Sequence, residues 1–142
     1  MILLDTNVIS ELMREDPNES VVSWLDQQFE TDLYLCAITK AEIECGIGLL
    51  DSGKRKLKLQ KAAVATFEFF PKRCLAYSCD AASRYTEIVV YTRRIGRPMS
   101  VEDMMIAAVA QSDSALLVTR NIKDFDFLPD LQLLNPWDWR SK

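Results

Sequence analysis

The sequence predicts an α/β fold in which helices cover both faces of a parallel sheet. Short apolar runs alternate with longer stretches whose apolar residues recur at helical spacing. The strand candidates are apolar throughout, which is typical of strands buried on both faces. A length of 142 residues indicates one domain of ordinary size, spanning residues 1–142.

In the first half of the chain, each strand candidate is an apolar run followed by a helix signal. The run at residues 2–4 stops at Asp5, and Thr6 is placed to cap a short helix. The run at residues 33–37 precedes Thr39, which opens a helix to about Leu50. The predicted elements are a strand at 2–4, a short helix, a turn at 17–20, a second helix, a strand at 33–37, and helices at 39–50 and 54–70.

In the second half, proline and glycine mark the breaks between elements. Pro71 stops the helix at 54–70, and the stretch 96–98 breaks the chain again. Asp80 is placed to cap a long helix that ends near Arg94. The predicted elements are a strand at 75–78, a helix at 80–94, a helix at 100–111, a strand at 115–119 and a fifth strand at 131–134.

Composition narrows the possible classes of protein. With 49% apolar and 27% charged residues, the chain is expected to be soluble and globular. None of the four cysteines forms a CxxC pair, so we expect no zinc site, and we interpret several of them, which lie in apolar surroundings, as small buried residues. The N-terminus does not resemble a signal peptide, and no apolar segment is long enough to span a membrane. We therefore expect a cytoplasmic protein with reduced thiols.

Several acidic and amide residues should meet at one edge of the sheet. Ligands of open parallel sheets bind outside the carboxyl ends of the strands. Each candidate follows a strand directly or lies at the start of a helix that begins at this edge. The candidates are Asp5, Glu42, Asp103, Asn121 and Asp124.

A cluster of carboxylates has a chemical consequence. Crowded carboxylates repel one another and raise their own pKa values, and a divalent cation removes that cost. Ligands that are all oxygen favour Mg²⁺ or Mn²⁺ over zinc, and such ions activate water for attack on phosphorus. The chain has no histidine, which excludes serine triads and paired-histidine acid–base chemistry.

Each acid also has a structural interpretation. Thr39 and Glu42 have the spacing of a capping box, in which Glu42 would bind the backbone N–H of Thr39. Ser100 and Asp103 resemble the same motif, and Asp5 is placed to cap the next helix. For each acid taken alone, the structural and the functional interpretation both stay open. All of these acids, however, are expected at the same edge of the sheet.

Four short motifs occur in order along essentially the whole chain. They are Leu4-Asp5-Thr6-Asn7, Ala37-Ile38-Thr39 with Glu42, Glu102-Asp103 with Ile106-Ala107-Ala108, and Thr119-Arg120-Asn121 with Asp124-Phe125. With their suitable spacing, these motifs resemble those of the PIN-domain ribonucleases, and within them the VapC/FitB group of bacterial toxins from type II toxin–antitoxin pairs. The closing Asn135-Pro136-Trp137 is also similar to that group.

The resemblance implies a three-layer α/β/α sandwich around a parallel sheet of four to five strands, and cleavage of RNA that depends on Mg²⁺ or Mn²⁺. It assigns metal binding to Asp5, Glu42 and Asp103, and prefers Asp103 to Glu102. It gives supporting roles to Thr6, Asn7 and Thr119. Some relatives have an acid where this chain has Asn121, so the fourth site position falls to Asn121 or Asp124.

Partners are also implied by the resemblance. The resemblance implies that the protein forms a homodimer and that a small antitoxin protein inhibits its active site. An RNA substrate needs positive charge near the acids, since the net charge of the chain is −4. The candidates for contact with the RNA backbone are Arg120, Arg97, Lys54 and Arg55.

Two other functions remain open. The first is an Mg²⁺-dependent phosphatase or phosphotransfer domain, for which an N-terminal strand ending in Asp5 is also suitable. Such enzymes usually have a second aspartate two positions later, where this chain has Asn7. The second is a non-catalytic binding module of the same fold, and only Asn121 favours it.

Overall fold

The computed structural model describes residues 1–142 and contains a five-stranded sheet in the order β3-β2-β1-β4-β5. All four pairs of neighbouring strands are parallel, as the sequence predicts. The strands are β1 (Ile2–Leu4), β2 (Leu33–Cys36), β3 (Cys74–Leu75), β4 (Leu116–Val118) and β5 (Leu133–Leu134). The helices are α1 (Thr6–Leu12), α2 (Glu19–Leu25), α3 (Ala37–Gly48), α4 (Lys54–Glu68), α5 (Cys79–Ile95) and α6 (Val101–Ser112), and short 3₁₀ turns occupy Glu30–Asp32, Ile122–Asp124 and Pro136–Asp138.

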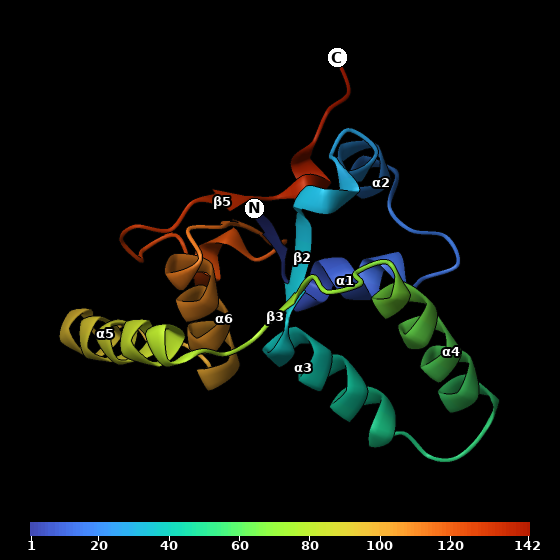
Figure 1. Ribbon diagram of the computed structural model, residues 1–142, viewed down its shortest axis with the longest axis horizontal. Coiled ribbons are helices and arrows are strands. Elements are labelled where there is room, and N and C mark those ends of the chain that lie inside the picture. Colours follow the sequence, from blue (N-terminus) through green and yellow to red (C-terminus); the bar gives the residue numbers. More distant parts are fainter.

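Two hydrophobic cores lie on opposite faces of the sheet. Neighbouring residues of a strand point to opposite faces, so Leu3 packs in one core and Leu4 in the other. Leu117 and Val118 divide between the same two cores. Helices α5 and α6 cover the first face, and α1, α3 and α4 lie on the second (Figure 1). The expected three-layer α/β/α sandwich is therefore confirmed.

The two edge strands are shorter than predicted. The strand predicted at 75–78 is Cys74–Leu75, and the strand predicted at 131–134 is Leu133–Leu134. Each edge strand pairs on one side only, with β2 or β4, and only two residues of each are in register with that neighbour. None of the helices combines the length and the apolar character needed to cross a bilayer.

The cysteines correct one expectation. Only Cys36, at the end of β2, is buried, whereas Cys45, Cys74 and Cys79 are exposed, and all four are free thiols. Cys45 lies on the solvent side of α3, Cys74 in an edge strand, and Cys79 in the first turn of α5. An apolar neighbourhood in sequence did not indicate burial here, because only the tertiary arrangement decides which face of each element is covered.

The cap of α5 is a second correction. Asp80 was the predicted cap, but the N-cap is Ser78, whose hydroxyl accepts from the backbone N–H of Ala81 at 3.1 Å. The N-cap lies two residues earlier than predicted, which places Asp80 in the first turn of the helix. An acid there still complements the positive end of the helix dipole.

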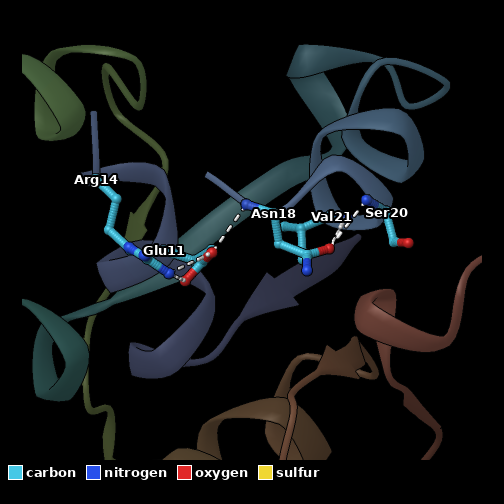
Figure 2. A network of polar contacts seen from close by, with 5 residues as sticks. All are labelled: Glu11, Arg14, Asn18, Ser20 and Val21. Carbon is cyan, nitrogen blue, oxygen red and sulfur yellow. Dashed lines mark hydrogen bonds and ion pairs between the residues drawn. The ribbon is translucent and has the colours of Figure 1, made fainter. Parts of the chain in front are cut away.

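A buried carboxylate joins the end of α1 to the start of α2 (Figure 2). Glu11 is 7% exposed, and its Oε1 accepts from the backbone N–H of Asn18 at 2.9 Å. Arg14 donates to both Glu11 oxygens, at 3.2 and 3.3 Å. Asn18 in turn caps α2, since its Oδ1 accepts from the backbone N–H groups of Ser20 and Val21. Glu11 thus fixes the direction in which the chain leaves the first helix.

We expect Glu11→Ala to lower the free energy of unfolding by about 2 kcal/mol, because it removes the hydrogen bond from the Asn18 N–H to a buried, charged acceptor. Arg14→Ala should cost less than about 1 kcal/mol, since the Arg14 side chain is 65% exposed and its ion pair is screened. Urea unfolding of both variants measures the difference. Equal losses would show that the ion pair, rather than the bond to Asn18, holds the turn.

Candidate active site

The Asp5 carboxylate is held by donors from two parts of the fold. Asp5 follows β1, is 4% exposed and forms the N-cap of α1. Its Oδ1 accepts from the backbone N–H of Thr6 at 2.8 Å. Its Oδ2 accepts from the Thr119 hydroxyl at 2.7 Å and from the Asn7 side-chain amide at 3.2 Å. Of the two residues predicted as caps of the first helix, Asp5 is therefore confirmed and Thr6 is wrong.

Asn7 and Thr119 connect the end of β1 to the end of β4. The Asn7 amide nitrogen donates to the Thr119 hydroxyl oxygen at 3.2 Å, and its Oδ1 accepts from the backbone N–H of Arg120 at 3.1 Å. The Thr119 oxygen also accepts from the backbone N–H of Asn121 at 3.1 Å. Because Thr119 is fully buried, its hydroxyl has a fixed place beside the Asp5 carboxylate.

Glu42 is oriented by a side chain of another helix. The Thr6 hydroxyl donates to Glu42 Oε1 at 2.7 Å, which joins the start of α1 to α3. The predicted capping box is wrong, because α3 begins at Ala37 with Cys36 as its N-cap, so Thr39 lies inside the helix. The carboxylate of Glu42 is thus free to face the edge of the sheet.

Thr39 is a residue whose contact with the site was missed from the sequence. It is fully buried, and its hydroxyl oxygen lies 3.2 Å from that of Thr6 and 3.8 Å from Cys36 Sγ. A hydroxyl group has only one hydrogen to donate. When Thr6 gives its hydrogen to Glu42, Thr39 can donate to Thr6 and fix its rotamer. The capping-box spacing hid this contact, which forms between different helices.

Asp103 lies in the first turn of α6 and is half-buried. Ser100 caps the helix as predicted, and its hydroxyl oxygen accepts from the backbone N–H of Asp103 at 3.1 Å. Burial, and then the negative charge of Asp5, raise the pKa of Asp103 to about 6, and the charges of Asp124 and Glu102 add to this effect. The cap bond uses the backbone N–H of Asp103, and the Ser100 side chain also opposes part of the rise in the pKa of this carboxyl.

Repulsion among the acids shows that they share one edge of the sheet. Burial and the charge of Glu42 raise the pKa of Asp5, although hydrogen bonds from Thr119, Thr6 and Asn7 oppose the shift. Burial and the charge of Asp103 raise the pKa of Glu42, against the hydrogen bond from Thr6. Each of the three carboxylates thus interacts with the other two, as the topology predicts.

The donor chemistry of these acids fits a hard divalent cation. All candidate ligands are carboxylate oxygens, the kind that Mg²⁺ and Mn²⁺ prefer. As they stand, however, no three acidic, cysteine or histidine side chains lie close enough together to hold one ion. Asp5 and Glu42 are instead engaged by the hydroxyls of Thr119 and Thr6. A bound cation would therefore require a rearrangement of these side chains.

The structure separates the two candidates for the fourth position. Asp124 ends the 3₁₀ turn after β4, and its charge acts on Asp103. Asn121 forms its contacts through the backbone, with its N–H on Thr119 and its carbonyl accepting from the N–H of Asp124 at 3.0 Å. Of the two, Asp124 is the one whose side chain borders the acidic cluster.

The four basic candidates divide into two groups. Arg97 lies beside the acids, because it lines the same small cavity as Asp103 and Asp124. Arg120 directly follows Thr119, and its guanidinium lies 5.1 Å from the centre of the Trp137 ring. Lys54 and Arg55 begin α4 at the outer end of the α3–α4 pair, away from the acids (Figure 1). Only an RNA that extends well beyond the site would reach them.

The pH dependence of stability follows from the raised pKa of Asp103. The unfolded carboxyl has a pKa of 3.8 and the folded one about 6, so the folded state binds more protons between these values. Stability of the metal-free protein therefore falls as pH rises through this range. We expect metal-free Asp103→Asn to be more stable than wild type by about 1 kcal/mol at pH 7.5, after allowance for screening of a half-exposed group.

This advantage should largely vanish near pH 4, where the folded carboxyl is protonated and the unfolded one is approaching its pKa of 3.8. Urea unfolding in EDTA between pH 4 and 8 measures it. Asp126→Asn, at an exposed position of the same charge type, is the matched control and should show no such trend. Stability curves of Asp103→Asn and wild type that run parallel across this range would contradict the repulsion described above.

Comparison with known proteins gives a consistent result. The PIN domain family profile matches residues 2–128. Toxin FitB of Neisseria gonorrhoeae is 41% identical over 138 residues, which cover 96% of this chain and 99% of that protein. The VapC ribonuclease Y4jK of Sinorhizobium fredii is 35% identical over 141 residues, covering 97% and 99%.

Solved structures agree. The crystal structure of FitAcB from Neisseria gonorrhoeae superposes with a TM-score of 0.87 at 41% identity, over 97% of this chain and 99% of that chain. VapBC2 from Rickettsia felis, bound to a DNA fragment from its promoter, superposes with a TM-score of 0.78 at 26% identity, over 95% and 98%. The protein therefore belongs to the PIN-domain family.

Proposed function

We propose that this protein is a metal-dependent endoribonuclease and the toxin of a bacterial type II toxin–antitoxin pair. The observation that carries the proposal is the group of mutually repelling carboxylates of Asp5, Glu42 and Asp103 at the carboxyl edge of the sheet. Relatives named as ribonucleases and as a toxin, aligned over nearly the whole chain, support it.

Asp5, Glu42 and Asp103 would hold Mg²⁺ or Mn²⁺, and Asp124 is the candidate for the fourth position. When bound, such an ion polarises a phosphoryl oxygen and activates water for attack on phosphorus. The chain supplies the orientation of the ligands. Thr119 and Asn7 fix the Asp5 carboxylate, and Thr6 fixes that of Glu42. Loss of such supporting residues typically lowers metal affinity or activity 10–100-fold.

The partners proposed for the chain are an RNA substrate, an inhibitory antitoxin and a second copy of the same chain. Relatives were solved as FitAB and VapBC toxin–antitoxin assemblies, which supports the antitoxin. An apolar side chain can contact a partner only if it is exposed. Leu49 is 87% exposed and is available, whereas Val21 and Trp24 are buried in the core and are not. A cytoplasmic location follows from the proposed substrate.

The phosphotransfer alternative is less well supported. The acid–base role in such enzymes falls two positions after the first aspartate, where Asn7 stands. Both ends of the Asn7 amide are engaged, by Asp5 and Thr119 on one side and by Arg120 on the other. This arrangement suits a residue that holds its neighbours in place rather than one that transfers a proton.

Removal of the central carboxylate tests the proposed function. We expect Asp5→Asn to lower the rate of RNA cleavage in Mn²⁺ or Mg²⁺ at least about a hundredfold, and to relieve growth arrest when the protein is produced in cells. EDTA should stop cleavage by the wild type, and added Mn²⁺ should restore it. Unchanged cleavage by Asp5→Asn would refute the proposed role.

A matched pair within α3 controls for general loss of negative charge. Glu42→Gln should lose activity as Asp5→Asn does, whereas Glu44→Gln should not, because Glu44 is exposed and paired with Lys40. Calorimetry with Mn²⁺ gives a readout that does not depend on catalysis. A wild-type protein that neither binds Mn²⁺ nor cleaves RNA would favour the non-catalytic module instead.

The Thr39 hydroxyl gives a finer test of ligand orientation. We expect Thr39→Val to weaken Mn²⁺ binding and cleavage about tenfold, because Thr6 loses the neighbour that fixes its rotamer. Thr39→Ser keeps the hydroxyl and should restore both quantities. If Val and Ser variants are equally impaired, the methyl group and its packing matter rather than the hydroxyl.

A further inference from the structure

A small hollow opens beside the acidic cluster, between the chain segment before α6 and the 3₁₀ turn after β4. Its volume is about 180 Å³. Acidic and cationic side chains line it together. The lining residues that matter are the acids Asp103 and Asp124, the cations Arg97 and Lys123, and Phe127.

The two cations that line the hollow have no protein counter-ion. Neither Arg97 nor Lys123 forms an ion pair, although Asp103 and Asp124 line the same hollow. The basic residues that do form ion pairs lie elsewhere in the fold and are Arg14, Lys40, Lys58 and Arg84. Two unpaired cations next to a cluster of carboxylates leave positive charge available to an anion that approaches the acids from this side.

Arg97 is held in a defined orientation. Its guanidinium lies 4.3 Å from the centre of the Phe127 ring, and Nη2 donates to the backbone carbonyl of Lys123 at 3.5 Å. Gly96, with φ of +69°, ends α5 in the left-handed conformation and allows the Arg97 N–H to donate to the Thr92 carbonyl at 3.0 Å. A stacked guanidinium keeps further N–H groups for a phosphate, which it binds in a fork geometry.

From this geometry we infer that the hollow binds a backbone phosphate of the RNA, next to the phosphate that is cleaved. The inference rests on the proposed nuclease function. A strand whose reacting phosphate meets Asp103 must continue past this hollow, and its next phosphate then meets Arg97 and Lys123. Because Arg97 and Lys123 would contact phosphate oxygens rather than base edges, recognition at this subsite is independent of sequence.

The test compares two double variants that each remove two positive charges. R97Q/K123Q should raise KM for a short single-stranded RNA about tenfold, as expected for loss of a charge-assisted contact, with little change in kcat. The slope of log KM against log salt should fall by about 0.7, the value for one phosphate of a single strand. K72Q/R140Q, at two exposed positions before β3 and after the last 3₁₀ turn, is the control and should leave both quantities unchanged.

Neutral methylphosphonate linkages then locate the contact. With wild type, neutralising one of the two linkages adjacent to the cleaved bond should raise KM by the same tenfold. R97Q/K123Q should show no further loss with that substrate, because the contact is already absent. Additive losses, equal losses in both double variants, or a fall in kcat alone would overturn the subsite.

Two further outcomes separate this inference from its premise. If wild type cleaves no RNA in Mn²⁺, the proposed nuclease function fails, and the subsite with it. If wild type cleaves RNA and R97Q/K123Q does so with unchanged KM, only the subsite fails. Unchanged KM together with weaker inhibition by the antitoxin would instead assign the hollow to a protein partner.

Discussion

The Asp5 carboxylate joins the central strand to its neighbour, and the arrangement of the site depends on it. Donors from the β4 end (Thr119) and from α1 (Thr6 and Asn7) converge on its two oxygens. These bonds favour the charged form, but burial outweighs them, and the pKa of Asp5 is raised. The fold therefore holds a carboxylate where charge is costly, directly after the central strand of a sheet covered on both faces.

The same constraint extends to Glu42 and Asp103. Parallel strands deliver their carboxyl ends to one edge, so a residue after β1, one in the helix after β2 and one at the start of α6 approach each other. Their mutual repulsion opposes stability in the absence of a cation. A site of this kind stores unfavourable electrostatics that binding of a positive ligand relieves, which links the energetics of the fold to the proposed chemistry.

Sequence reasoning succeeded where a local pattern and the topology agree. The apolar strands, the parallel sheet and the edge at which Asp5, Glu42 and Asp103 meet all follow from hydrophobic runs and from the alternation of strands and helices. It failed where two local patterns compete. The spacing of Thr39 and Glu42 is that of a capping box, yet α3 starts directly after β2, so Thr39 turns inward to Thr6 and Glu42 is left for the site. Likewise, the N-cap of α5 is Ser78 and not the predicted Asp80.

By itself, the sequence determined the order of strands and helices, the absence of histidine chemistry and the presence of acids after successive strands. These properties depend on residue type and on spacing along the chain. Only the tertiary structure decided which carboxylates raise one another's pKa values and which hydroxyl donates to which acid. It also placed Asp124 near Asp103, and left Arg97 and Lys123 without ion pairs beside these acids. Such contacts join residues far apart in sequence, and their energies depend on distance and burial, which spacing along the chain does not specify.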